Sequence, residues 1–235
     1  MPRLDQLLAR NLGISRREVT LILRRGMVES PNGDRLRDGR ARIELPTVVR
    51  VRGELLELRE HVHLMQHKPV GVVSSRSDPQ HPTAWDLLAA APMHDRLVAV
   101  GRLDLDAAGL LLWTTDGSRV HALTHPRRGV PRTYQVALAR AWSKPEGEVR
   151  LADGFVPRIV SLDELDDARR HPALEPPEGT RALATITVLD GAHHEVKRIF
   201  AALDSHVLRL ARVSHAAIEL PHDLPAGGWR ELPAI

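Results

Sequence analysis

Residues 101–117 read GRLDLDAAGLLLWTTDG and combine a polar loop with an apolar run. Asp104 lies in the middle of the loop, and the run at 110–113 predicts a buried strand. A second short strand is expected at 98–100, directly before the loop. Glycines on both sides of the acidic residues allow sharp turns. A carboxylate held between two strands is well placed to act as a nucleophile, so Asp104 is the first candidate catalytic residue.

The composition indicates a folded protein of the cytoplasm. The chain is 43% hydrophobic and 27% charged, which excludes a disordered protein, and it has no apolar run of about 18 residues that would predict a membrane span. The first residues lack the apolar core of a signal peptide. Because the sequence has no cysteine, disulfides, thiolate metal sites and thiol catalysis are excluded.

The charge is unevenly distributed along the 235 residues. The net charge is +3, yet residues 1–58 alone hold 12 Arg against 8 Asp and Glu. The basic excess therefore belongs to the N-terminal quarter of the chain. Two interpretations stay open on charge alone: this quarter is a docking surface for a polyanion, or it is a solvated arginine-rich face.

Two short helices and a hairpin are predicted in this quarter. Apolar residues with helical spacing predict a helix at 3–12. Ser15 and Glu18 fit a capping box that opens a second helix, which ends at Gly26. An Asn-Gly turn follows. Short strands are expected at 27–30, 41–45 and 48–51.

Basic residues gather on the second helix. Arg17 and Arg24 are seven residues apart and share one exposed face, with Arg16 and Arg25 beside them. The Arg-Leu-Asp near the start, the Ser-Arg that opens the helix and the Gly-Met-Val before the turn are similar to the S4 RNA-binding domain. This resemblance covers residues 1–58 and implies that the four arginines contact phosphates of structured RNA.

Four ordered motifs in residues 59–235 resemble those of the RNA pseudouridine synthases. They are Lys-Pro-Val-Gly at 68–71, the stretch at 101–117, Arg-Thr-Tyr-Gln-Val at 132–136 and Asp-Gly-Ala-His-His-Glu-Val-Lys-Arg-Ile-Phe at 190–200. The resemblance implies an α+β protein: a small N-terminal S4 domain of two helices and a hairpin, and a catalytic domain with a mixed, mainly antiparallel sheet flanked by helices and loops.

The resemblance also implies roles for three residues at the reacting centre. Asp104 acts at the ribose C1′ region, and the alternatives of nucleophile and base stay open. Tyr134, the only tyrosine in the chain, stacks on the target base. Lys197 pairs with the aspartate, and an opposite charge within about 4–6 Å keeps a carboxylate ionised.

Further residues are expected around this centre. Arg102 helps to displace the target nucleotide, and Arg198 contacts the RNA. Lys68 shapes the floor of the site and is counted among the residues that bind the RNA. Asp106 is either a second carboxylate of the reaction or a residue that hydrogen-bonds the loop.

No cofactor and no metal are expected. His193 and His194 are neighbours that cannot easily share one ion, and nothing nearby supplies the other ligands. Two residues depart from the family pattern, because Asp190 replaces the usual Glu and Glu195 the usual Gln. We expect Glu195 to add a negative charge near Lys197, which would weaken the pair of Lys197 with the catalytic aspartate.

The substrate is expected to be ribosomal RNA. The Asp-Pro-Gln-His-Pro-Thr loop at 78–83 and the Val-Lys-Arg-Ile-Phe-Ala-Ala stretch at 196–202 resemble the small-subunit branch of the family. This branch implies isomerisation of uridine 516 of 16S rRNA, free or in a pre-30S particle. We expect a monomer. The alternatives are the branch that modifies 23S rRNA, a non-catalytic RNA-binding assembly factor favoured by Glu195, and a glycosidase or nucleosidase that would use Asp106 as its acid.

Overall fold

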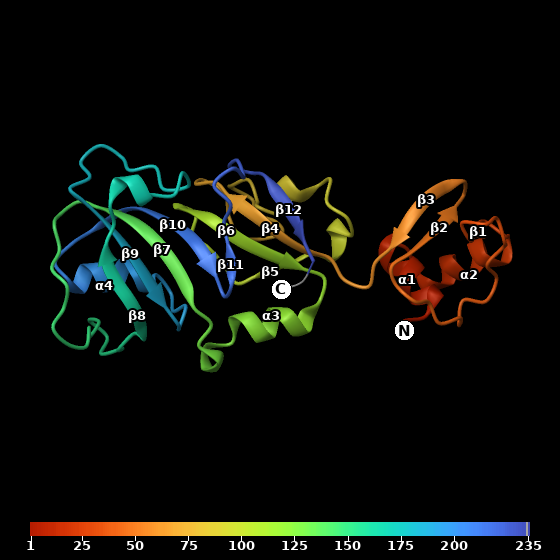
Figure 1. The fold of residues 1–235 in the computed structure, drawn as a ribbon, viewed down its shortest axis with the longest axis horizontal. Coiled ribbons are helices and arrows are strands. Elements are labelled where there is room, and N and C mark those ends of the chain that lie inside the picture. Colours follow the sequence, from red (N-terminus) through yellow and green to blue (C-terminus); the bar gives the residue numbers. More distant parts are fainter. Residues whose placement is uncertain (234) are drawn as a thin grey trace. The chain divides into compact units, whose positions relative to one another are not determined.

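The structure, a computed structural model, describes residues 1–233 and 235. The chain forms two compact units, one made of residues 1–62 and 90–97, the other of residues 63–89 and 98–235 (Figure 1). Within the described residues, the helices are too short or too polar to cross a membrane. The α+β class and the mixed sheet predicted from the sequence are confirmed.

The first unit packs two helices against a small antiparallel sheet of order β1-β2-β3. Ser15 caps the second helix, and its hydroxyl and the Glu18 carboxylate complete the predicted capping box. Apolar residues of both helices and of the sheet share one core. The elements are α1 (Leu4–Asn11), α2 (Arg16–Arg24), β1 (Val28–Glu29), β2 (Thr47–Val51) and β3 (Glu54–Leu58).

One strand of this sheet lies later in the chain than expected. The range 41–45 forms only an isolated bridge between Arg42 and Arg3, and the third strand is β3 instead. Arg52 and Gly53 connect β2 to β3, and both have positive φ, 51° and 91°. Two such residues form the tight hairpin turn whose twist matches antiparallel strands, so β2 pairs with the chain that directly follows it.

The second unit is built on a nine-stranded sheet. The main order is β12-β4-β6-β10-β7-β9-β8, with β5 beside β6 and β11 beside β10 (Figure 1). The strands are β4 (His63–Lys68), β5 (Val98–Val100), β6 (Ala107–Thr114), β7 (Arg132–Leu138), β8 (Ile159–Glu164), β9 (Ala182–Val188), β10 (Val207–His215), β11 (Ile218–Glu219) and β12 (Trp229–Leu232). The helical segments are η1 (Asp86–Leu88), η2 (His94–Arg96, in the first unit), α3 (Gly117–Thr124), η3 (Pro126–Arg128), η4 (Asp167–Arg169) and α4 (Glu195–Ala202).

The pairing of β6 with β10 is parallel, and the other pairings of this sheet are antiparallel. All eight residues of β6 are buried, as the apolar run in the sequence predicts. Parallel neighbours begin at the same edge of a sheet. The loop that precedes β6 and the helix α4 that precedes β10 are therefore brought to one edge.

Two loops carry local structure of their own. The loop at 78–83 leads into the short η1, whose first turn is held by hydrogen bonds between Thr83 and Asp86. The stretch 165–180 contains the buried His171 and Leu174. His171 Nε2 lies 3.0 Å from the carbonyl of Leu220, so this loop covers part of the core.

Candidate active site

Asp104 lies in the loop between β5 and β6, at the edge of the sheet where β10 also begins. Its carbonyl accepts a hydrogen bond of 3.1 Å from the amide of Ala107, which closes a turn directly before β6. The Asp104 side chain is one-third exposed, at 33%. The carboxylate is therefore fixed by its backbone and still open to a ligand.

The Lys-Pro-Val-Gly turn at 68–71 holds this loop through hydrogen bonds to its backbone. The amide of Gly71 donates to the carbonyl of Leu105 at 2.8 Å, and Lys68 Nζ donates to the carbonyl of Ala107 at 2.7 Å. Lys68 is fully buried, and burial lowers its pKa to about 8 even though Asp104 and another loop carboxylate attract its proton. We correct the expectation that Lys68 binds RNA: its ammonium group has no exposed surface and bonds to backbone carbonyls instead.

Lys197 reaches the loop from the first half of α4. Its Nζ lies 3.1 Å from Asp104 Oδ2 and 2.7 Å from Asp106 Oδ1. Burial alone would lower the pKa of Lys197, but its hydrogen bonds to the two carboxylates outweigh burial and raise that pKa. Lys197 therefore stays protonated near neutral pH and gives the loop a permanent positive charge.

Asp106 binds Lys197 through both of its oxygens, at 2.7 and 3.0 Å. Partial burial would raise the pKa of Asp106, yet the Lys197 hydrogen bond and charge hold it below the usual value. A carboxyl with a lowered pKa is ionised at neutral pH and is a poor general acid. This geometry argues against the glycosidase alternative and gives Asp106 a role in orienting Lys197.

Asp104 opens onto a cleft of about 770 Å³. Tyr134 lines it from β7 with a largely buried ring, and Arg102 lines it from the loop with an exposed side chain. Leu210 of β10 adds an apolar wall. The structure thus brings Asp104, Tyr134 and Lys197, which lie far apart in the sequence, to one cavity.

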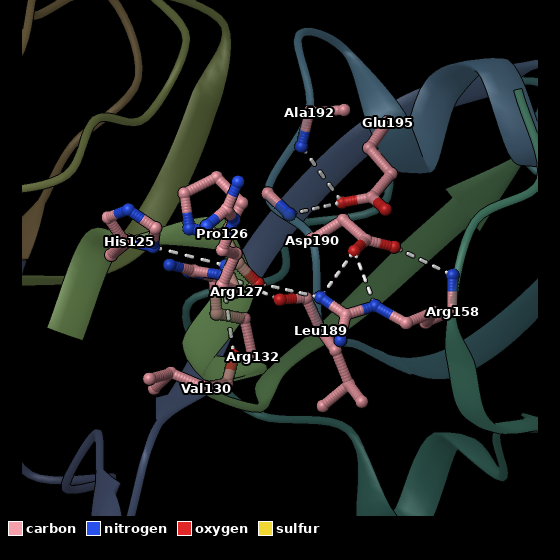
Figure 2. Close-up of polar contacts among 11 residues, drawn as sticks. His125, Pro126, Arg127, Val130, Arg132, Arg158, Leu189, Asp190, Ala192 and Glu195 are labelled. Carbon is pink, nitrogen blue, oxygen red and sulfur yellow. Dashed lines mark hydrogen bonds and ion pairs between the residues drawn. The ribbon is translucent and has the colours of Figure 1, made fainter. Parts of the chain in front are cut away.

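Glu195 does not lie against Lys197, contrary to our expectation. Its Oε2 accepts hydrogen bonds from the amides of Gly191 and Ala192, at 2.8 and 3.2 Å (Figure 2). The side chain is buried, burial raises its pKa, and its Oε1 has no partner among the described residues. Glu195 therefore fastens the loop that precedes α4.

Asp190, the other departure from the family pattern, is tied to Arg158. The amide and Nε of Arg158 donate to Asp190 at 2.7 and 2.6 Å, and Nη2 of Arg158 donates to the carbonyl of Pro126 at 2.7 Å (Figure 2). One guanidinium thus joins η3 to the loop at 190–194. Both segments adjoin residues that line the cleft, so the pair stabilises its wall.

Arg198 lies outside the cleft lining and pairs with Asp153 at 2.5 Å. Two other arginines also line the cleft, although neither was predicted to be a site residue. Arg132 is buried and donates to the carbonyls of Leu123 and Val130, and Arg212 is 1% exposed. The sequence could have indicated Arg212, because residues two apart in a strand lie on the same face and Leu210 was already a candidate wall residue.

His194 is a further neighbour of Asp104 that the sequence analysis had considered only as a metal ligand. Its Nε2 lies 3.6 Å from Asp104 Oδ2, and its ring stacks on that of His193 with centroids 3.8 Å apart. His194 is the residue before α4 and has a φ of 50°. The sequence could have indicated this contact, because His194 lies three residues before Lys197 and so on the same side of the helix start.

Comparison with known proteins identifies the family. The family model described as RNA pseudouridylate synthase matches residues 62–202, which is more than half of the chain. Ribosomal large subunit pseudouridine synthase B of Yersinia pestis is 35% identical over 98% of this chain and 72% of its own length. An uncharacterized RNA pseudouridine synthase of Aquifex aeolicus is 33% identical over 98% of this chain and 92% of its own length.

A solved structure agrees with the sequence relatives. A crystal structure of a pseudouridylate synthase superposes with a TM-score of 0.61 and is 29% identical. The match covers 99% of this chain and 96% of that one. The cleft that joins Asp104, Tyr134 and Lys197 thus lies in a chain that belongs to the RNA pseudouridine synthase family.

Proposed function

We propose that this protein converts uridine to pseudouridine in the ribosomal RNA of the large subunit, with Asp104 as the reacting carboxylate. The observation that supports the chemistry best is the contact of Lys197 Nζ with Asp104 Oδ2, 3.1 Å, in a cleft that Tyr134 also lines. The RNA class rests on the names of the relatives, several of which are large-subunit enzymes. These names favour the 23S alternative over uridine 516 of 16S rRNA, our expectation from the sequence.

The proposed reaction is an isomerisation whose atoms balance without a co-reactant. The C1′–N1 bond of the uridine breaks, the freed base turns, and C1′ bonds to C5. C5 loses a proton and N1 gains one. A carboxylate suits this chemistry because it can form and release a sugar ester or accept a ribose proton.

The cleft supplies what an extruded nucleotide requires. Leaving the base stack costs a few kcal/mol. Stacking of the base on the Tyr134 ring is expected to offset about 1–3 kcal/mol of this cost. Arg102 is exposed beside Asp104, where its guanidinium can take the place of the displaced nucleotide in the RNA.

The first unit is proposed to bind structured RNA as an S4-like domain. Arg17, Arg24 and Arg25 are exposed on and just after α2. Arg16 is exposed too, but its guanidinium pairs with Asp5 at 2.6 Å. We therefore assign the phosphate contacts chiefly to the other three arginines.

The test is the Asp104→Asn variant, which keeps the size of the side chain and removes its charge. Loss of the carboxylate is expected to lower pseudouridine formation by about 10³-fold or more, because no other group replaces a reacting nucleophile or base. Pseudouridines are mapped by carbodiimide-dependent reverse-transcription stops on 23S and 16S transcripts. RNA binding, measured by filter retention, should be preserved.

Three results would contradict the proposal. Normal turnover by Asp104→Asn would remove this residue from the mechanism. A wild-type protein that modifies 16S and not 23S transcripts would return the substrate to the small subunit. Release of free uracil would indicate hydrolysis and not isomerisation.

A further inference from the structure

His194 occupies a backbone conformation that a side chain rarely adopts. With φ 50° and ψ 30° it lies in the left-handed region, immediately before α4. Such a conformation costs about 1 kcal/mol or more for a residue other than glycine, and strained residues gather at functional sites. The conformation directs the ring to the catalytic loop, where Nε2 lies 3.6 Å from Asp104 Oδ2.

The His194 ring is held in place and still reaches solvent. It stacks on the ring of His193 at an interplanar angle of 23°, which restricts its rotation. The His194 side chain is 44% exposed. The ring therefore contacts the carboxylate on one side and water on the other.

The two basic side chains that contact Asp104 approach the same oxygen. Lys197 and His194 approach Oδ2, at 3.1 and 3.6 Å, whereas Oδ1 has no hydrogen-bond or ion-pair partner among the described residues. A carboxylate held through one oxygen presents the other in a fixed direction. The geometry thus separates a held oxygen from a free one.

We propose that His194 is a positioning residue that, together with Lys197, holds Asp104 Oδ2 so that Oδ1 is the oxygen that reacts with the target nucleotide. The proposal rests on the catalytic role proposed for Asp104 above. His194 contributes a polar ring nitrogen close to Oδ2, beside the ammonium group of Lys197.

Lys197 provides the other contact of Asp104 Oδ2. It keeps its charge because its hydrogen bonds to the two loop carboxylates raise its pKa. The other titratable and charged groups around His194 are Asp106 of the loop, His193, Glu195 and Arg198 next to it in the chain, and Arg102, Arg132 and Arg212 of the cleft.

The experiment compares His194→Gln and His194→Ala in single-turnover reactions on an RNA substrate at pH 8. Glutamine keeps a polar N–H group that can approach the carboxylate, whereas alanine has none. We expect His194→Ala to lose about tenfold in rate and His194→Gln to retain most of it.

His193→Phe is the matched control, since it keeps a stacking ring and removes the neighbouring imidazole. It should lose much less of the rate than His194→Ala. RNA affinity and melting temperature should be unchanged in all three variants, which excludes a merely structural role. Equal rates of His194→Ala and wild type at pH 8, or equal losses in His194→Ala and His194→Gln, would overturn the proposal.

The outcome is distinct from a failure of the proposed function. If Asp104→Asn remains active, the role of the carboxylate itself is wrong. If Asp104→Asn is inactive and the His194 variants behave as the wild type, only the role of His194 is refuted.

Discussion

Gly109 shows how a single residue positions the site. It has a φ of 106° and lies opposite Arg212 in the parallel pairing of β6 with β10. A Cβ at this position would overlap the carbonyl oxygen of Arg212. Because Gly109 has no side chain, β6 and β10 can lie side by side. Their pairing brings the loop that carries Asp104 close to α4, which carries Lys197.

We expect Gly109→Ala to destabilise the protein by about 3 kcal/mol or more, because it combines a strained φ with a backbone clash. The measurement is urea unfolding followed by circular dichroism. Gly147→Ala is the control, since a Cβ there meets no atom within 4 Å and the backbone has no positive φ. Its stability should stay within about 0.5 kcal/mol of the wild type. Equal stability of the two variants would contradict this account of the strand pairing.

At the same scale, the residue types of the site were predictable and the directions of some side chains were not. Asp104, Tyr134 and Lys197 were named from the sequence, and they do line one cleft. Glu195 was expected beside Lys197, but its carboxylate bonds to the amides of the preceding loop. That direction depends on the backbone path of 190–194, which includes a left-handed residue and has no local sequence signature.

At the scale of elements, β10 connects the two halves of the larger sheet. It lies between β6 and β7 and buries three basic residues, Arg209 partly and Arg212 and His215 almost fully. His215 Nε2 lies 3.2 Å from the carbonyl of Leu123, and its Nδ1 has no partner in the described part of the chain. Burial, with the charges of Arg212 and Arg132, lowers the pKa of His215 to about 3.

This shift predicts a loss of stability in mild acid. The unfolded chain binds a proton at His215 near its ordinary pKa of about 6.5, whereas the folded protein resists it down to about 3. The stabilisation is complete above pH 6.5 and is lost as the pH falls below that value. From pH 7 to pH 5 the expected loss is about 2 kcal/mol in the free energy of unfolding.

Urea unfolding at the two pH values measures this change. His215→Gln keeps a donor for the carbonyl of Leu123 and has no titratable ring, so its stability should fall less between pH 7 and pH 5. The burial of His171 lowers its pKa too, and its contribution remains in both proteins. An identical pH dependence in the variant and the wild type would show that His215 accepts a proton in the folded state.

The elements themselves were partly predictable. Both helices of the first unit and the strand β6 follow from apolar spacing and from the capping box. The strand β3 was missed because its turn, Arg52-Gly53, lacks the familiar Asn-Gly pair and its residues mix charge with apolar side chains. The central place of β10 could not be read from local pattern, because it depends on pairing with strands distant in the sequence.

At the scale of the whole molecule, the two units divide the proposed work. The cleft with Asp104 belongs entirely to the second unit, while the exposed arginines of α2 belong to the first. Phosphate contacts by arginine position a protein on RNA and carry little sequence information. RNA affinity and the rate of pseudouridine formation should therefore respond to different substitutions.

Charge reversal in the first unit tests this division. Arg17→Glu combined with Arg24→Glu should weaken RNA binding and reduce the slope of log affinity against log salt by about 1–2, because about two phosphate contacts are lost. The single-turnover rate at saturating RNA should be unchanged. The control, Arg37→Glu with Arg40→Glu, makes the same change of net charge at other exposed sites of the unit. If the two double variants reduce the slope equally, binding depends on the total charge of the unit and not on the position of Arg17 and Arg24.

The place of β10 also bears on when activity can arise during synthesis of the protein. A nascent chain that lacks residues 207–215 has no strand to join β6 to β7, so the edges of β6 and β7 that face β10 stay unpaired. Lys197, too, is synthesised only after β4 to β9. Because domains fold as units during translation, the growing polypeptide pairs Asp104 with Lys197 only after these strands have been made. The catalytic cleft of this enzyme is therefore complete only once β10 has been synthesised.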